Sequence, residues 1–421
     1  MDKGKNYQIK DIKLAPQGKK NIAWAEMQMK ALLKVRERFK KQKPLKGVRI
    51  GSCLHITKET AVLIKTLIAG GAKVAACSCN PLSTQDDVAA ALARAGIKVW
   101  AYKGETKRDY YKFLNKVIEF RPQITIDDGC DLVSEIHRVH QDLIPEIIGG
   151  CEETTTGVIR LRAMEAEAAL KYPIVAVNES RTKCLMDNIK GTGQSTIDGI
   201  LRATNMLLAG KNFVVVGYGH CGKGLAKRAQ GMDANVIVTE VDYFAALQAV
   251  MDGFRVMPIS QAAKIGDIFV TVTGNKNVID AKHMKLMKDG AILANSGHFD
   301  AEINIRGLKK ITKRQRNIRP FMDEFTLTNE KRIFVLAQAR LVNLAAGEGH
   351  PSAIMAMSFI NQCFACEFLV KNKGKLEPRV YVLPKEKDDE IARLQLEALG
   401  IKIDKLTKEQ KLYLKTWDQG T

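Results

Sequence analysis

The stretch FVVVGYGHCGKGLAKRAQGMDANVIVTE, residues 213–240, decides the fold of half the chain. An apolar strand runs into a G-x-G-x-x-G motif made by Gly217, Gly219 and Gly222. In such a motif the first glycine allows a tight turn, the second lets the backbone approach a pyrophosphate, and the third lets the helix pack on the strand. The next strand ends in Glu240, at about the spacing where a carboxylate accepts from ribose hydroxyls and repels a 2′-phosphate. The motif therefore predicts a Rossmann domain that binds NAD rather than NADP.

A second alternating pattern precedes this motif. Residues 1–45 are predicted to be largely helical, and apolar strands then alternate with helices as far as residue 128. This alternation indicates a parallel sheet, whose strands present their carboxyl ends at one edge. The polar residues that follow these strands are His55, Thr57, Glu59, Asn80, Ser83, Thr84, Gln85, Asp127 and Asp128. We expect a site at this edge, formed before the nucleotide motif begins.

Beyond the motif, two more strands place polar groups at the edge of the second sheet, namely Thr273, Gly274, Asn275, Asn295, Gly297 and His298. The turn GEGHPS and an apolar helix then lead back to the first unit. The predicted fold is α/β, with two doubly wound parallel-sheet domains and a short C-terminal helical tail. The NAD domain is inserted in a substrate-binding domain. The expected boundaries are 1–185 and 346–385 for the substrate domain, 186–345 for the NAD domain and 386–421 for the tail.

Composition excludes several classes of protein. The N-terminus is polar, and no apolar run approaches the roughly 18 residues of a membrane span, so a soluble cytoplasmic protein is expected. The nine cysteines, an odd number without a secretion signal, favour free thiols, with Cys363 and Cys366 packed in the core. His137 and His140 are interpreted as surface residues. The net charge of +20, concentrated in residues 36–46 and 306–319, is interpreted as a solvated surface, and no nucleic-acid partner is expected.

Motifs along the whole chain resemble those of the S-adenosylhomocysteine hydrolases, in the short form of archaea and thermophiles. They are LHITKETAVLI, NPLSTQDDVAAAL, KGET, DDGCDL, EETTTGV, TKCLMDN, VVVGYGHCGKG, ANSGHFD, RLVNLAAGEGHPS and YVLPK. The resemblance implies reversible hydrolysis of S-adenosylhomocysteine to adenosine and homocysteine in the methyl cycle. The steps are 3′-oxidation, β-elimination, water addition and re-reduction. It also implies a homotetramer in which every protomer holds one tightly bound NAD that is not consumed.

The resemblance assigns roles to individual residues and implies no metal. The catalytic residues are His55, Asp128, Lys183, Asp187 and His298. The substrate-binding residues are Thr57, Glu59, Glu153 and His350. The cofactor-binding residues are Thr154, Thr155, Thr156, Asn188, Gly217, Gly219, Gly222, Glu240, Asn275 and Asn343.

Within these sets, Lys183 and Asp187 are expected to handle the 3′-hydroxyl, with the pKa of Lys183 lowered by desolvation. Asp128 and His55 are expected to move protons at the 4′ and 5′ carbons. Glu153 is expected to hold ribose hydroxyls, and the adenine is expected to be read by Thr57 and Glu59. His350 and Phe299 would form a gate, with hinges near 181–189 and 344–350.

Three alternatives stay open at this stage. An S-inosylhomocysteine hydrolase would share the motifs but read hypoxanthine. A 2-hydroxyacid dehydrogenase would share the two-domain plan, but no catalytic Arg with a Glu–His pair is evident. A non-catalytic NAD-binding regulatory relative would share the fold. The chain ends LTKEQKLYLKTWDQGT and lacks the Lys/Tyr extension that long-form members lend to the NAD site of a neighbouring protomer.

Overall fold

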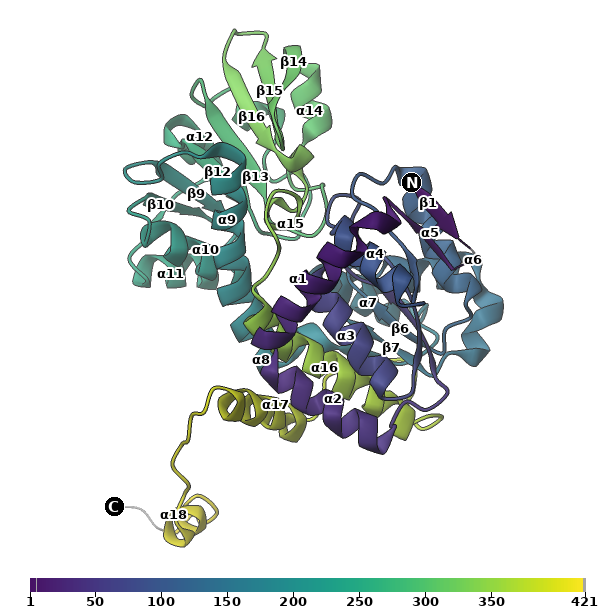
Figure 1. Cartoon of the computed structure of the whole chain (residues 1–421). Coiled ribbons are helices and arrows are strands. Elements are labelled where there is room, and N and C mark those ends of the chain that lie inside the picture. The colour runs from purple at the N-terminus through teal and green to yellow at the C-terminus, as the bar shows by residue number, and fades with distance from the viewer. Residues whose placement is uncertain (5, 419–421) are drawn as a thin grey trace.

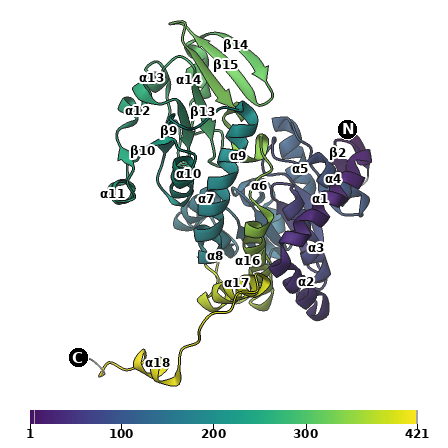
Figure 2. The same ribbon diagram turned by 60° about the vertical axis from the view of Figure 1, so that its left-hand side comes forward.

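Two mainly parallel sheets, each covered by helices on both faces, form the structure (Figures 1 and 2). It is a computed structural model that describes residues 1–4 and 6–418. The first sheet has the order β1-β2-β5-β4-β3-β6-β7-β8-β17. Its strands are β1 Asp2–Gly4, β2 Tyr7–Ile9, β3 Arg49–Cys53, β4 Lys73–Cys77, β5 Lys98–Trp100, β6 Ile124–Asp127, β7 Gly149–Glu152, β8 Ile174–Ala176 and β17 Val380–Tyr381. The chain order reverses between β3 and β6, the position where ligands bind in doubly wound sheets.

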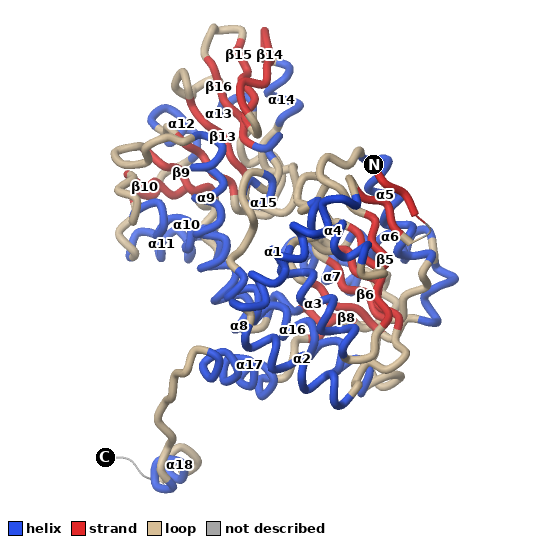
Figure 3. The backbone as a smooth tube through the Cα atoms, viewed as in Figure 1, coloured by secondary structure: helices blue, strands red, loops and turns tan. Residues whose placement is uncertain are grey.

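The second sheet follows the same plan, with the order β11-β10-β9-β12-β13-β16-β15-β14. Its strands are β9 Asn212–Val216, β10 Asn235–Thr239, β11 Arg255–Val256, β12 Ile268–Thr271, β13 Ala291–Asn295, β14 Thr312–Arg319, β15 Met322–Leu327 and β16 Arg332–Leu336. Here the order reverses between β9 and β12. At one edge of the sheet, β15 runs opposite to the other strands named here and pairs antiparallel with both β14 and β16 (Figure 3). The predicted fold of two doubly wound sheets with a helical tail is confirmed.

Most helices connect one strand to the next along the chain, and a π-helix at Cys184–Gly191 joins the two units. The α-helices are α1 Ala15–Gln28, α2 Lys30–Gln42, α3 Lys58–Ala69, α4 Asp86–Arg94, α5 Lys107–Glu119, α6 Asp131–Val139, α7 Thr155–Ala166, α8 Arg181–Lys183, α9 Thr192–Thr204, α10 His220–Gln230, α11 Tyr243–Met251, α12 Ile259–Ile265, α13 Ala281–Met284, α14 Ile305–Lys310, α15 Val342–Ala345, α16 Ser352–Lys371, α17 Lys385–Ala398 and α18 Lys408–Tyr413. Short 3₁₀ turns lie at Ile12–Leu14, Gln141–Glu146, Val177–Glu179 and Ala337–Ala339.

Each sheet separates two apolar cores. Alternation along β8 shows why, because Val175 packs into one core of the first sheet while Ile174 and Ala176 pack into the other. The return helix α16 forms a wall of the first of these cores, and α17 packs on it with Ile391. The first core is therefore built from both ends of the chain.

Helix α16 corrects one expectation from the sequence. It is 20 residues long with a mean hydropathy of 1.6 in its most apolar window, so length and composition alone would let it cross a membrane. However, 72% of that window is buried inside the protein. The helix packs against β7 and against α2 and α3, which is typical of a core helix. Cys363 and Cys366 lie on it, both fully buried and free, as predicted.

Two further expectations need revision. Residues 1–45 are not helical throughout, because β1 and β2 form a hairpin whose second strand extends the first sheet beside β5. His137 and His140 are half-buried rather than surface residues, and His140 Nε2 lies 2.7 Å from the Asn115 side-chain oxygen. The basic run 306–319 forms α14 and the exposed edge strand β14. The domain boundaries at residues 185, 345 and 385 stay a prediction.

Candidate active site

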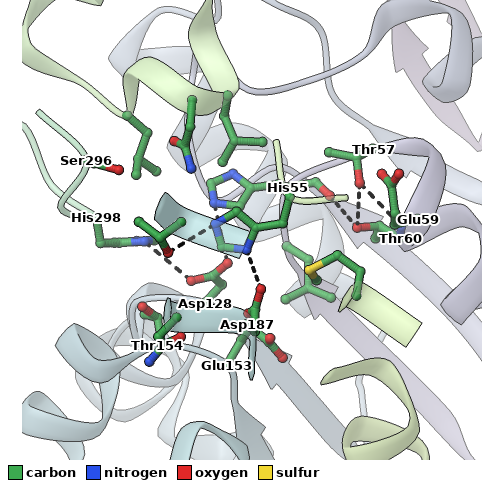
Figure 4. Close-up of a pocket in the computed structure, with 18 of the residues that line it drawn as sticks. His55, Thr57, Glu59, Thr60, Asp128, Glu153, Thr154, Asp187, Ser296 and His298 are labelled. Atoms are coloured by element: carbon green, nitrogen blue, oxygen red, sulfur yellow. Dashed lines mark hydrogen bonds and ion pairs between the residues drawn. The ribbon is translucent and has the colours of Figure 1, made fainter. Parts of the chain in front are cut away.

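A cavity of about 130 Å³ lies between the two units, at the carboxyl ends of the strands of the first sheet. Residues from both units line it, and Figure 4 shows how their side chains converge. All nine residues predicted to act on or bind the substrate line this cavity: His55, Thr57, Glu59, Asp128, Glu153, Lys183, Asp187, His298 and His350. The structure therefore brings together groups that lie far apart in the sequence.

His55, Asp128 and His298 form one cluster. His55 follows β3 and Asp128 follows β6, so both flank the point where strand order reverses. The Asp128 carboxylate lies 3.4 Å from His55 Nε2 and 3.3 Å from His298 Nδ1 (Figure 4). Burial lowers the pKa of His55 to about 4, although Asp128 opposes the shift. His55 is thus a neutral imidazole near neutral pH, and an imidazole beside a carboxyl group is suited to proton transfer.

Two neighbours fix the ring of His55 from its other side. Its Nδ1 lies 2.7 Å from Ser83 Oγ and 3.2 Å from Cys79 Sγ. The donor atoms of His55, Asp128 and His298 all lie within 4.8 Å of one another, a spacing that a metal ion could also accept. The prediction that the chain uses no metal stays a prediction.

Lys183, Asp187 and Glu153 form the second cluster. Lys183 ends α8 and Asp187 lies one turn later in the π-helix, so Lys183 Nζ is 2.7 Å from Asp187 Oδ2. Glu153 Oε1 lies 3.6 Å from the same ammonium and has no hydrogen-bond partner among the described residues. All three side chains are buried, so this is not a surface ion pair. Such a site can hold and deprotonate a sugar hydroxyl.

The predicted direction of the Lys183 pKa shift is wrong. Desolvation does act to lower the pKa of Lys183, but the carboxylates of Asp187 and Glu153 outweigh it, and the pKa is raised. The pKa of Asp187 is lowered, because His350 and Lys183 outweigh its burial. Burial raises the pKa of Glu153 to about 7 even though Lys183 acts against the shift. The sequence predicted the contact but not the balance of charge around it.

His350 lies just before α16, on the segment that leads back to the first unit, and it completes the cluster of Lys183, Asp187 and Glu153. Its Nδ1 contacts Asp187 Oδ1, and its Nε2 lies 3.3 Å from Thr192 Oγ1. This histidine therefore ties the loop after α15 to the π-helix and α9. Phe299, its predicted partner in a gate, lies beside a different cavity and contacts the ring of His298 edge-on, at 4.7 Å between centroids.

Thr57 and Glu59 lie at the opposite end of the cavity. Thr57 caps α3, and its side chain accepts a hydrogen bond from Thr60 N. Glu59 is 2% exposed, and its Oε1 accepts from Ser352 Oγ at 2.5 Å and lies 3.3 Å from Lys58 Nζ. The buried carboxylate of Glu59 can accept a hydrogen bond from an amino group of a purine.

Sequence reasoning missed two residues that support these clusters. Gln362 donates to Glu153 Oε2 at 2.6 Å, and Ser352 donates to Glu59. The sequence does contain a signal for Gln362, which is an amide in the mainly apolar α16. A fully buried amide needs a hydrogen-bond partner. Conversely, Asp127 has a structural role, since its carboxylate accepts from the backbone of Asp128 and Val133 at the start of α6.

The nucleotide motif has the shape predicted for it. Gly217 has φ of 103°, and a β-carbon at Gly222 would lie 2.1 Å from Gly217 O. At Gly219 a β-carbon would meet nothing within 4 Å, so open space lies beside the N-terminus of α10. Glu240 directly follows β10, and its carboxylate accepts from the backbone N–H groups of Tyr218, Val241 and Asp242. The loop therefore fits a dinucleotide pyrophosphate.

The other predicted cofactor residues lie in two places. Thr154, Thr155, Asn188 and Asn343 line the main cavity, whereas Thr156 and Asn275 line a second cavity of about 160 Å³. The side-chain oxygen of Asn343 is buried and has no hydrogen-bond partner among the described residues. A bound ligand that donates there would satisfy it.

Comparisons with known proteins match two separate stretches of the chain. The S-adenosyl-L-homocysteine hydrolase family matches residues 6–144. The domain described as "S-adenosyl-L-homocysteine hydrolase, NAD binding domain" matches residues 188–349. The adenosylhomocysteinase of Saccharolobus solfataricus is 58% identical over 417 residues, covering 99% of this chain and 100% of that protein.

The chain belongs to the S-adenosyl-L-homocysteine hydrolase family. Its NAD-binding domain is the one that the glycine motif predicted. Within the family, the Aquifex aeolicus adenosylhomocysteinase is 58% identical, and the S-inosyl-L-homocysteine hydrolase of Methanocaldococcus jannaschii is 55% identical, each over 99% of this chain and 100% of that protein. The two names show that family membership alone does not specify the purine.

One solved structure supports the fold alone. A dipicolinate synthase polypeptide from Bacillus halodurans superposes with a TM-score of 0.50 at 13% identity, over 78% of this chain and 99% of that one.

Proposed function

We propose that the chain is an NAD-dependent hydrolase that reversibly cleaves S-adenosyl-L-homocysteine to adenosine and L-homocysteine. One observation supports this proposal best. A single cavity between the NAD-binding unit and the other α/β unit is lined by both a Lys–Asp–Glu cluster and a His–Asp–His cluster. NAD bound in this unit would supply the hydride acceptor for oxidation at the 3′ carbon and would return the hydride in the last step. Gly217, Gly219, Gly222 and Glu240 would hold the dinucleotide, with Thr154, Thr155, Thr156, Asn188, Asn275 and Asn343 around it.

The Lys–Asp–Glu cluster would act at the ribose hydroxyls. Glu153 Oε1, which lacks a hydrogen-bond partner among the described residues, would accept from a ribose hydroxyl. Lys183 would take the 3′-hydroxyl proton. Because neighbouring carboxylates raise the pKa of Lys183, its ammonium must first release a proton within the cluster, and Asp187 with His350 forms the contact route.

The His–Asp–His cluster would act at the 4′ and 5′ carbons. A ketone at the 3′ carbon acidifies the 4′ proton, and Asp128 would remove it. The C5′–S bond then breaks, and homocysteine leaves with a proton supplied through His55. Water adds at the 5′ carbon with the proton transfers reversed. His298, which shares the carboxylate of Asp128, would keep that group oriented.

Adenine, rather than hypoxanthine, is the base that we propose. Glu59 Oε1 accepts from Ser352 Oγ and lies 3.3 Å from Lys58 Nζ, so a carboxylate oxygen, which is an acceptor, faces the base at this end of the cavity. Adenine presents an amino donor at its 6 position, whereas hypoxanthine presents a carbonyl oxygen, which a carboxylate repels. Thr57 would add a second polar contact.

We also propose that the protein is a cytoplasmic homotetramer. Among the residues that the structure describes, two groups of exposed apolar side chains are of interest here. One is on and beside α11, and the other is on the tail that extends away from the body (Figure 1). The first comprises Val241, Tyr243, Phe244, Leu247, Val250 and Met251, and the second Ile401, Ile403, Leu406, Leu412, Leu414 and Trp417. Contact between copies would remove both from water.

The experiment that tests the reaction uses purified protein with S-adenosyl-L-homocysteine and an adenosine deaminase to remove one product. We expect free thiol to accumulate over many turnovers without net formation of NADH. Steady NADH production would indicate an ordinary dehydrogenase, and absence of thiol with or without added NAD would indicate a non-catalytic relative. Faster thiol release from S-inosyl-L-homocysteine would overturn the assignment of Glu59.

A further inference from the structure

A buried carboxylate in the NAD-binding unit has no part in the chemistry described so far. Glu302 is 2% exposed and follows the loop after β13. Its oxygens accept from Thr273 N at 2.8 Å, from Thr273 Oγ1 at 2.7 Å and from Gly274 N at 2.9 Å. Across residues 1–4 and 6–418, no Lys, Arg or His forms an ion pair with it. Backbone and hydroxyl donors alone therefore stabilise this buried carboxylate.

The same carboxylate joins two loops at the edge of the second sheet. A β-carbon at Gly297 would lie 1.7 Å from Glu302 Oε1, so the loop that carries His298 packs directly on the carboxylate. On the other side, Thr273 Oγ1 donates to Glu302 while it accepts from Asn275 N at 3.0 Å. Glu302 thus fixes Thr273, and Thr273 fixes the backbone of Asn275.

The second cavity lies where these loops face the other unit. Glu302, Gly274 and Asn275 line it together with Thr156, which belongs to α7 of the first unit. Thr156 Oγ1 would lie 3.6 Å from a β-carbon at Gly274, so the loop 273–275 sits against that helix start. A displacement of the loop 273–275 would therefore change the shape of the second cavity and the contact of the loop with α7.

We infer that Glu302 is a positioning residue that holds the loop 273–275 in the shape that receives NAD and couples it to the loop carrying His298. This inference rests on the proposed function, because the loops matter only if NAD binds between them. Its carboxylate contacts Thr273 and Gly274 and packs against Gly297, and we assign its effect on NAD to these contacts.

Glu302→Gln tests the inference with a side chain of the same length. The amide keeps one acceptor oxygen but turns its NH₂ toward a donor, so at least one of the three hydrogen bonds is lost. We expect the Kd for NAD, measured by calorimetry on protein stripped of NAD, to rise about ten-fold. Thr273→Val should raise it similarly, and the double variant should be little worse than either single one, because both remove the same link.

Asp267→Asn is the matched control. Asp267 lies at the amino end of β12, where it accepts from Asn212 N and Lys288 Nζ, at the opposite end of the strand from Thr273. We expect it to lower the melting temperature of the stripped protein without changing the Kd for NAD.

If Glu302→Gln lowered the melting temperature as the control does and left the Kd unchanged, its role would be structural only and the inference wrong. Wild-type protein that turned over substrate would uphold the proposed function in that case. Wild-type protein that bound no NAD would overturn both.

Discussion

At the scale of single residues, burial and charge act against each other in the cavity, and the winner differs from group to group. His55 has a carboxylate nearby, yet its burial dominates and its pKa falls to about 4. Lys183 is more deeply buried, yet two carboxylates dominate and its pKa rises. The distances to the nearest carboxylate explain this difference. Lys183 Nζ lies 2.7 Å from Asp187, whereas His55 Nε2 lies 3.4 Å from Asp128. A shorter contact gives the stronger attraction.

The pKa of His55 predicts an acid-sensitive stability. The unfolded state binds a proton on this histidine below pH 6.5, whereas the folded state does so only below about 4. Protons therefore favour unfolding as pH falls through this window, and the free energy of unfolding should drop by up to about 3 kcal/mol.

Denaturant unfolding at pH 7 and pH 4 measures this drop. His55→Asn should remove it, and His140→Asn, outside the cavity, should keep it. An equal pH dependence in wild type and His55→Asn would contradict the expected shift.

At the scale of elements, two glycines of one loop are needed for different reasons. Gly222→Ala would push a β-carbon against Gly217 O, so it should destabilise the protein by about 1–3 kcal/mol even without NAD and also weaken NAD binding. Gly219 has an ordinary φ of −72° and open space beside it. Gly219→Ala should change the stability of the NAD-free protein by under about 0.5 kcal/mol while weakening NAD binding at least ten-fold.

Melting curves and NAD titrations of the two variants separate these effects. If Gly219→Ala bound NAD normally, the loop would not hold the pyrophosphate.

The elements also show how far sequence reasoning reached. Polar residues after apolar strands predicted the edge of the first sheet, and the glycine spacing predicted the loop geometry, because both patterns are local. β1 and β2 were missed because three-residue strands have no measurable period, and they are held by pairing with each other and, for β2, with the distant β5. Gln362 and Ser352 were missed because their partners are 209 and 293 positions away. The direction of the Lys183 pKa shift depends on packing that no spacing encodes.

At the scale of the whole molecule, the exposed apolar face of α11 predicts association. Phe244→Glu combined with Leu247→Glu places two charges where side chains are 68% and 52% exposed in the single chain. The fold should survive because surface changes of this kind cost little. The mass measured by light scattering should fall below four chains.

Tyr111→Glu, at a separate exposed aromatic on α5, serves as the control and should stay tetrameric. A tetramer that persisted in the double variant would show that α11 lies outside the interfaces.

The return of the chain through α16 has a consequence for synthesis on the ribosome. The second sheet and its helices lie within one continuous stretch, so their two cores can close once about residue 345 has emerged. The first unit begins earlier, but one of its cores needs residues from Ala356 to Ile391. The part of the protein that is translated first is therefore the last to finish folding. Until α16 and α17 have been made, the first unit exposes the apolar face that these helices cover, beside a second unit that has already folded.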